Sequence, residues 1–132
     1  MDLEPIAGKY REKSWLDSRI EVGRSSIQGK GLFAKESIKE GGTAIIFGGV
    51  LMTNEDIKAN RHRPRSAVEI GEGLYIAGHV EDPEEDPDEN LNHSCDPNLW
   101  MQDEVTLIAR RDIEKGEELT VDYAMWASRQ EW

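Results

Sequence analysis

The sequence predicts a mostly β fold with few short helices, and three observations lead to this prediction. Apolar residues gather in many short segments, of a length typical of strands. Turn-forming residues, above all glycine, separate these segments. Only one segment carries clear helix signals, and no internal repeat is present. With 132 residues, the chain is expected to form one domain that covers positions 1–132.

The first half of the chain contains three expected strands. Residues 18–22 (SRIEV) alternate apolar and polar side chains, as a half-buried strand does. A glycine-containing turn at 25–31 leads into a second strand at 31–34. Residues 43–52 (TAIIFGGVLM) predict a third, apolar strand. The adjacent glycines inside it, Gly48 and Gly49, indicate a bulge or a close approach of another backbone.

The second half contains one expected helix, a hairpin and several strands. A helix is predicted over 53–60, with Thr53 or Asn54 as its N-cap and Pro64 preventing its continuation. The acidic segment 81–89 (EDPEEDPDE) carries two prolines and is expected to be a solvated loop. The other expected elements are a hairpin of strands 67–70 and 74–77 around a turn at 71–73, strands at 99–101, 105–109 and 118–123, and turns at 102–104 and 113–116.

Charge and composition restrict the possible partners. The formal net charge is -11 and the sequence pI is about 4.7, so the chain lacks the basic surface that direct nucleic-acid binding requires. The same charge attracts a basic partner. There is no apolar run of membrane-spanning length, so no membrane association is expected. A single cysteine and no signal-peptide pattern favour an intracellular location.

The segment 89–98 (ENLNHSCDPN) gathers polar and reactive residues, which a metal site, a Cys/His nucleophile or a shaped backbone turn would use. Structural zinc needs four ligands, and only His93 and Cys95 are close in sequence, so no metal is expected. A calcium loop counted from Asp82 has Pro87 where glycine is required. In an extended strand, His93 and Cys95 point the same way but lie about 7 Å apart, which disfavours a nucleophilic pair.

A backbone turn that grips a ligand gains support from GKGLFA at 29–34. Its two glycines allow backbone groups to approach a ligand closely. It is not a dinucleotide-binding fingerprint, because the third glycine and the following helix are absent. Taken alone, this stretch is better explained by an ordinary β-turn, so by itself it does not decide between the alternatives.

Three motifs in order, GKGLFA at 29–34, NHSCDPN at 92–98 and GEELTVDY at 116–123, resemble a SET domain, the fold of protein lysine methyltransferases. The resemblance covers about 19–126. It leaves 1–18 as a peripheral N-terminal segment and 124–132 as an aromatic C-terminal tail.

The resemblance implies several small sheets around a C-terminal pseudoknot, in which the last strand passes through a loop formed by the segment before it. This crossing would unite Asn92, His93 and Tyr123. The implied cofactor is S-adenosyl-L-methionine. The residues that the resemblance assigns to cofactor binding are Lys30, Gly31, Leu32, Asn92, His93, Tyr123 and Trp126, and Tyr123 is also the implied catalytic residue.

The chain departs from the family pattern at several positions. Phe47 stands where the family often has tyrosine, which removes a hydroxyl from the implied substrate channel of Phe47, Met101 and Val121. Glu89-Asn90-Leu91 replaces the Arg-Phe-Ile that often precedes the NHS motif. The cysteine-rich zinc segments of many relatives are missing, so the resemblance implies a minimal, stand-alone and metal-free SET domain.

Two hypotheses for function follow from the resemblance. The first is S-adenosylmethionine-dependent methyl transfer to the lysine ε-amine of a basic protein or peptide, such as a histone or a histone-like protein. The alternative is a catalytically weak or inactive binding module for the cofactor or a basic partner, and Phe47 is the feature that favours it. The expected location is the cytoplasm if the host is a microbe, or the nucleus if it is a eukaryote or a virus.

Overall fold

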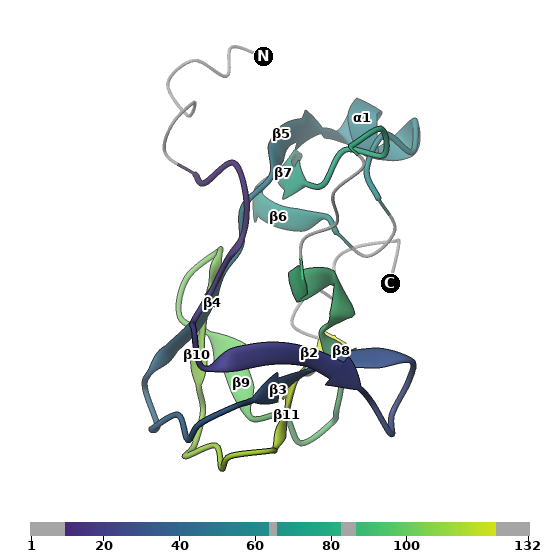
Figure 1. The fold of residues 1–132 in the computed structure, drawn as a ribbon. Coiled ribbons are helices and arrows are strands. Elements are labelled where there is room, and N and C mark those ends of the chain that lie inside the picture. Colours follow the sequence, from purple (N-terminus) through teal and green to yellow (C-terminus); the bar gives the residue numbers. More distant parts are fainter. Residues whose placement is uncertain (1–9, 64–65, 83–86, 124–132) are drawn as a thin grey trace.

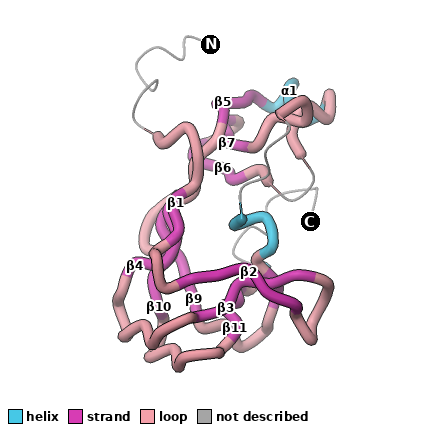
Figure 2. Tube along the Cα trace, in the orientation of Figure 1, coloured by secondary structure: helices cyan, strands magenta, loops and turns pink. Residues whose placement is uncertain are grey.

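The computed structural model describes residues 10–63, 66–82 and 87–123, and strands dominate this part of the chain (Figures 1 and 2). The prediction of a mostly β fold with several small sheets is confirmed. The elements in chain order are β1 (Trp15–Leu16), β2 (Ile20–Arg24), β3 (Lys30–Ala34), β4 (Thr43–Ile46), β5 (Val50–Thr53), α1 (Asn54–Lys58), β6 (Val68–Gly71), β7 (Leu74–Ala77), the 3-10 helix η1 (Pro87–Asn90), β8 (Asn92–His93), β9 (Leu99–Met101), β10 (Thr106–Ala109) and β11 (Glu118–Val121).

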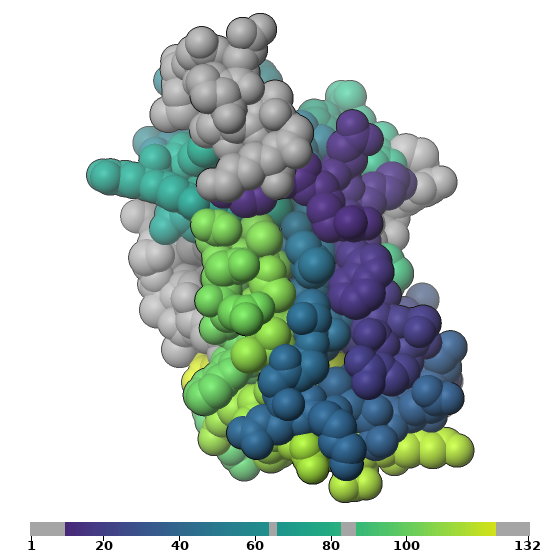
Figure 3. Space-filling view, turned by 90° about the vertical axis from the view of Figure 1, so that its left-hand side faces the viewer, coloured from purple at the N-terminus to yellow at the C-terminus, as the bar shows by residue number. Residues whose placement is uncertain are grey.

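The strands of the described residues form three sheets. The first has the order β1-β4-β10-β9, the second β2-β3-β11-β8 and the third β5-β7-β6. Figure 3 shows one face of the first sheet, where the N-terminal segment in purple lies alongside β4 in blue and the β9–β10 hairpin in green.

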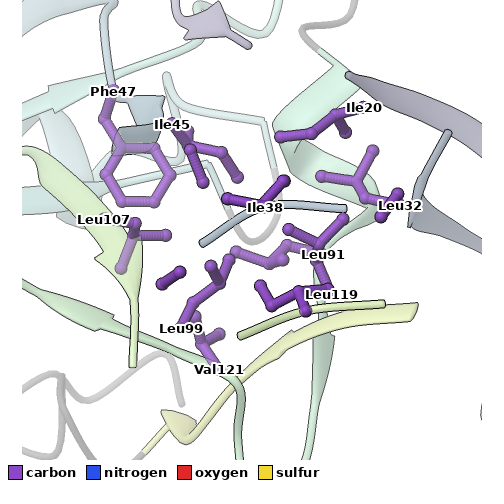
Figure 4. Close-up of a cluster of buried hydrophobic side chains, with 14 of the residues drawn as sticks. Ile20, Leu32, Ile38, Ile45, Phe47, Leu91, Leu99, Leu107, Leu119 and Val121 are labelled. Carbon is purple, nitrogen blue, oxygen red and sulfur yellow. The ribbon is translucent and has the colours of Figure 1, made fainter. Parts of the chain in front are cut away.

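One apolar core joins the two four-stranded sheets. Leu32 of β3, Ile45 of β4 and Leu119 of β11 are fully buried in the same cluster, although they come from both sheets (Figure 4). Burial of such side chains is the main favourable term in folding, at about 1.5–3 kcal/mol for each large aliphatic residue. The core therefore fixes how the two sheets lie against each other.

The expected strand at 43–52 is two strands that belong to different sheets, so the prediction of one strand was wrong. The chain leaves the first sheet after β4 and enters the third sheet at β5, and the two glycines lie between them. A Cβ on Gly48 would lie 2.4 Å from the carbonyl group of Lys13, and one on Gly49 would lie 2.5 Å from Ala77 O. The predicted close backbone approach is confirmed at both glycines.

Part of the segment expected to be peripheral belongs to the first sheet. β1 pairs antiparallel with β4, with Trp15 opposite Ile46 and Leu16 opposite Ile45. Further along, Gly49 N donates to Arg11 O at 2.9 Å. Residues 10–16 therefore cover the edge of β4.

The predicted helix and the predicted hairpin are both present. α1 begins after Thr53, which forms a capping box with Asp56, and the helix ends at Lys58. β6 and β7 form the expected hairpin, and β7 is the centre of the third sheet because it also pairs with β5. None of the helices within the described ranges has both the length and the apolar character needed to span a bilayer.

The acidic segment differs from the expected loop at its C-terminal end. Residues 87–90 form η1, in which Asp88 O accepts a hydrogen bond from Leu91 N at 3.1 Å. Asn90 Nδ2 also donates to Pro87 O at 3.0 Å. A proline at the first position suits such a turn, because its fixed φ is helical and its missing N–H is not needed there.

Candidate functional site

The second sheet brings together all three sequence motifs, because GKGLFA contributes β3, NHSCDPN contributes β8 and GEELTVDY contributes β11. β11 lies between β3 and β8, antiparallel to β3 and parallel to β8. In this register Thr120 is opposite Asn92 and Val121 is opposite His93. Leu119 is opposite Leu32 on the other side of β11. Residues that are far apart in the sequence therefore meet along one short strand.

Tyr123 is held against the Asn92–His93 strand by three contacts. Its hydroxyl donates to Leu91 O at 2.8 Å, and its backbone N–H donates to His93 Nδ1 at 3.0 Å. The rings of Tyr123 and His93 lie 5.1 Å apart at an interplanar angle of 49°. The phenolic oxygen thus lies directly beside the residue that precedes the Asn92–His93 pair.

Asn92 connects β8 with the glycine turn. The side chain is almost fully buried, and its Nδ2 lies 3.0 Å from Lys30 O and 3.2 Å from Gln28 O. The same nitrogen lies 2.9 Å from Glu118 Oε2. Oδ1 accepts no hydrogen bond from the described residues, so it is available as an acceptor.

A carboxylate that the sequence analysis did not single out completes this connection. Ser25 Oγ lies 2.8 and 2.9 Å from the two carboxylate oxygens of Glu118. The carboxylate lies over Gly31, where a Cβ would come within 2.3 Å of Glu118 Oε2. Gly31 is therefore needed for space, and Glu118 joins the glycine turn, β11 and Asn92. The sequence shows that Glu118 belongs to the GEEL motif, but it does not show which residues Glu118 contacts.

The glycine turn presents an open backbone surface beside this network. Gly29 has a φ of +48°, and a Cβ built there would meet no atom within 4 Å. Lys30 is exposed, whereas Gly31 and Leu32 are buried. A hollow of about 400 Å³ is lined by Val22, Gly23, Arg24, Gly29 and Lys30.

The three residues expected to line the substrate channel share one cluster with Tyr123. Phe47 is 5% exposed and Val121 is fully buried, and both belong to the main core. Met101 and Tyr123 are partly buried and pack against that core. Trp126, the remaining residue expected to bind the cofactor, lies outside the described residues.

His93 and Cys95 are closer than the sequence analysis expected. His93 Nε2 lies 3.4 Å from Cys95 Sγ, because β8 ends at His93 and the chain bends at the following residues. The inference from extended-strand spacing that the two side chains lie out of hydrogen-bond reach was therefore wrong. The pair still lacks a free base: His93 Nδ1 accepts the N–H of Tyr123, so the ring proton is on Nε2 and points to the sulfur.

Metal ligands do not gather in the described part of the chain. No group of three or more His, Cys, Asp or Glu side chains is arranged there to hold a metal ion. The site is therefore built from backbone groups, the Asn92 amide, the Glu118 carboxylate and the Tyr123 phenol.

Comparison with known proteins identifies the family. The SET domain family profile matches residues 29–124. Histone-lysine N-methyltransferase 2D of Homo sapiens is 34% identical over 119 residues, which are 80% of this chain and 2% of that protein. Histone-lysine N-methyltransferase TRX1 of Oryza sativa subsp. japonica is 32% identical over 143 residues, which cover 98% of this chain and 14% of that protein. The chain thus spans a small part of the curated relatives it matches.

A solved structure has the same fold. It is the Polycomb repressive complex 2 of Chaetomium thermophilum in an autoinhibited conformation bound to S-adenosylmethionine. The TM-score is 0.62 at 23% sequence identity, and the match covers 86% of this chain and 15% of that one. Together with the three motifs and the β3-β11-β8 arrangement, these matches lead to one conclusion: the chain belongs to the SET domain family.

Proposed function

We propose that this chain transfers a methyl group from S-adenosyl-L-methionine to the ε-amine of a lysine in a basic protein. The observation that carries the proposal is the position of Tyr123, whose hydroxyl is 2.8 Å from Leu91 O and whose backbone is bonded to His93. A phenol fixed beside the Asn92–His93 strand is the group that such a transfer needs for orienting the incoming amine.

The residues around the glycine turn fit the cofactor. S-adenosylmethionine has a charged amino-acid end and a hydrogen-bonding adenine, and it supplies the electrophilic methyl group when bound. The open backbone at Gly29 and the unoccupied acceptor on Asn92 offer partners for such groups. Backbone contacts to the cofactor would come from three residues of β3, namely Lys30, Gly31 and Leu32. A further backbone contact would come from His93 of β8.

The reacting lysine must lose its proton before it can act as a nucleophile. With an unperturbed pKa of about 10.4, neutral lysine costs about 4.6 kcal/mol at pH 7. A positive sulfur about 4 Å from the amine disfavours the ammonium form by about 4 kcal/mol at an effective dielectric constant of 20. Removal of water from a narrow channel acts in the same direction. The site therefore does not require a dedicated strong base.

Tyr123 would orient the neutral amine. Its own proton is donated to Leu91 O, and a phenolic oxygen that donates its proton can also accept an N–H, here from the substrate amine. That hydrogen bond turns the nitrogen lone pair toward the methyl group. Tyr123 is thus assigned the catalytic role, with the Leu91 carbonyl fixing the direction of its hydroxyl.

The apolar side chains near Tyr123 would form the channel for the lysine stem. Phe47, Met101 and Val121 belong to the cluster against which Tyr123 packs, and Met101 is its partly exposed member. Phe47 carries no hydroxyl, so the phenol that orients the amine would come from Tyr123. Trp126 is proposed to cover the cofactor from the C-terminal tail.

The net charge of -11 and the named activity of the relatives support a basic substrate such as a histone or a histone-like protein. Opposite charges accelerate association and favour lysine-rich segments over neutral ones. We therefore place the acceptor lysine in a basic protein segment.

The first test measures methyl transfer from labelled cofactor to a panel of basic proteins that includes histones. We expect transfer by the unaltered chain, and Tyr123→Phe should lower kcat at least about 100-fold because the amine loses its orienting oxygen. Cofactor affinity, measured by calorimetry, should change less than about threefold.

Tyr75→Phe is the matched control, because the Tyr75 hydroxyl makes an exposed hydrogen bond to Asn54, the first residue of α1, in another sheet than Tyr123 contacts. Its kcat should stay within about twofold of the unaltered chain. Undiminished transfer by Tyr123→Phe would refute the catalytic role. Cofactor binding without transfer to any protein of the panel would favour the alternative, a binding module.

A further inference from the structure

A buried ion pair joins the loop between α1 and β6 to the segment that carries the Leu91 carbonyl. Arg63 Nε donates to Glu89 Oε1 at 3.0 Å, and Arg63 Nη2 donates to Glu89 Oε2 at 2.8 Å. Both side chains are only 11% exposed. This bidentate ion pair fixes the relative orientation of the guanidinium and the carboxylate as well as the distance between them.

The guanidinium of Arg63 is itself anchored. Its Nη1 donates to His79 O at 3.0 Å, and the backbone N–H of Arg63 donates to Gly78 O at 2.8 Å. A Cβ on Gly78 would lie 2.2 Å from Arg63 Nη2, so the glycine at this position leaves space for the guanidinium. Arg63 is thereby fixed to residues 78 and 79, which directly follow β7.

Glu89 lies in η1, two residues before the carbonyl that receives the Tyr123 hydroxyl. Leu91 N donates to Asp88 O at 3.1 Å, and the Leu91 side chain is 5% exposed in the core. The turn of η1 lies between the third sheet and β8 in Figure 1. A displacement of Glu89 would therefore move the Leu91 carbonyl and change the direction of the Tyr123 hydroxyl.

Net stability is a weak explanation for such a pair. The loss of water around two buried charges offsets most of their attraction, so a buried ion pair adds little free energy of unfolding by itself. Its bidentate geometry does restrict where the two segments can lie. This restriction acts on the segment that orients the proposed catalytic hydroxyl.

We propose that Arg63 and Glu89 are positioning residues that hold the Leu91 carbonyl against the hydroxyl of Tyr123. The inference rests on the proposed methyl transfer for its effect on rate, but the positional effect can be measured without it. Glu89 stands where the family often carries arginine, so this chain achieves the placement with an acidic residue and a partner from the loop between α1 and β6.

The test uses Glu89→Gln, which keeps the shape of the side chain and removes its charge. The ¹³C NMR shift of the Leu91 carbonyl is read in the free protein, with Tyr123→Phe defining the shift that follows loss of the hydroxyl contact. We expect Glu89→Gln to move the shift in the same direction. We also expect kcat to fall about tenfold, with cofactor affinity within about twofold.

Asp17→Asn is the matched control, because it removes a charge from another arginine–carboxylate pair that lies outside the site, Arg19 with Asp17. It should leave the Leu91 shift and kcat unchanged. Arg63→Lys keeps the positive charge but loses the bidentate contact with Glu89. It is the variant to measure if near-UV circular dichroism shows that the Glu89→Gln protein is unfolded.

An unchanged Leu91 shift in a folded Glu89→Gln or Arg63→Lys protein would overturn the inference. Unfolding of both variants would also overturn it, because the pair would then serve stability. Since the shift is read without cofactor or substrate, absence of methyl transfer by the unaltered chain would refute the proposed function and still leave the positional inference testable.

Discussion

Asn98 holds three polar groups where β11 passes the segment that follows β8. Its Nδ2 donates to Glu117 Oε2 and to Glu118 O, both at 2.8 Å, and its Oδ1 accepts the N–H of Thr120 at 2.9 Å. The residue is 2% exposed. One amide side chain therefore bonds two backbone groups of β11, the Glu118 carbonyl and the Thr120 N–H.

Replacement of Asn98 by alanine would leave the Thr120 N–H and the Glu118 carbonyl without this partner in a buried environment. We expect Asn98→Ala to lower the free energy of unfolding by about 2–4 kcal/mol, measured by urea denaturation. Asn54→Ala, which removes an exposed hydrogen bond to Tyr75, should cost less than about 1 kcal/mol. Equal losses in the two variants would contradict the role given to Asn98.

The sequence motifs predicted Asn92, His93 and Tyr123 as neighbours, and the structure brings them together through β8 and β11. The polar partners of these residues could not be predicted in the same way. Ser25 and Glu118 are 93 positions apart, and no spacing rule relates a serine in a turn to a carboxylate in the last strand. Their contact exists only because β3 and β11 pair.

Secondary structure elements were predictable where alternation or turn chemistry extends over several residues. The β6–β7 hairpin and α1 with its Thr53 cap follow from such local patterns. β1 and β8 have two residues each, which is too short for an alternating pattern to be detected. Their strand character comes from pairing with β4 and β11, elements that are distant in the sequence.

The β9–β10 turn illustrates how a carboxylate stabilises a short element. Asp103 Oδ1 accepts the backbone N–H groups of Val105 at 3.0 Å and Thr106 at 2.8 Å. These hydrogen bonds, chiefly that of Val105, hold the pKa of Asp103 below its ordinary value of 3.8. A carboxyl whose pKa is lowered on folding stabilises the folded state above its unfolded pKa, and this contribution is lost as the pH falls through the folded pKa.

Asp103→Asn keeps the accepting oxygen but cannot titrate. We expect the unaltered chain to be more stable than Asp103→Asn near pH 6, and the difference to shrink as the pH falls below 3.8 and through the lowered pKa of Asp103 in the folded state. Urea denaturation across this range provides the measurement. Glu104→Gln is the control, since the described residues give the Glu104 side chain no hydrogen bond, and its difference should not depend on pH in this way. A pH-independent difference for Asp103→Asn would contradict the assignment.

At the scale of the whole molecule, the last described strand completes the site. β11 lies between β3, from the first quarter of the chain, and β8, which begins at residue 92. The order of the strands within each sheet therefore differs from their order in the sequence. The first and second sheets also share one core. Local patterns cannot give such an arrangement, and it was the resemblance carried by three ordered motifs that implied it.

The charge of the whole chain leads to a last prediction, which concerns the proposed basic substrate. With 27 acidic and 16 basic residues, the chain should attract a lysine-rich peptide over a long distance. Raising the salt from about 20 to about 200 mM shortens the screening length from about 20 Å to about 7 Å. The KM for such a peptide should therefore rise several-fold, and kcat should change little because the reacting groups are in close contact.

The matched substrate is the same peptide with every lysine except the acceptor replaced by glutamine. Its KM should depend only weakly on salt, because little long-range attraction remains to be screened. An equal rise of KM for both peptides would mean that salt acts on the enzyme or on the acceptor lysine itself. The acidic surface would then have no part in selecting the substrate, and the proposal of methyl transfer through Tyr123 would be unaffected by that result.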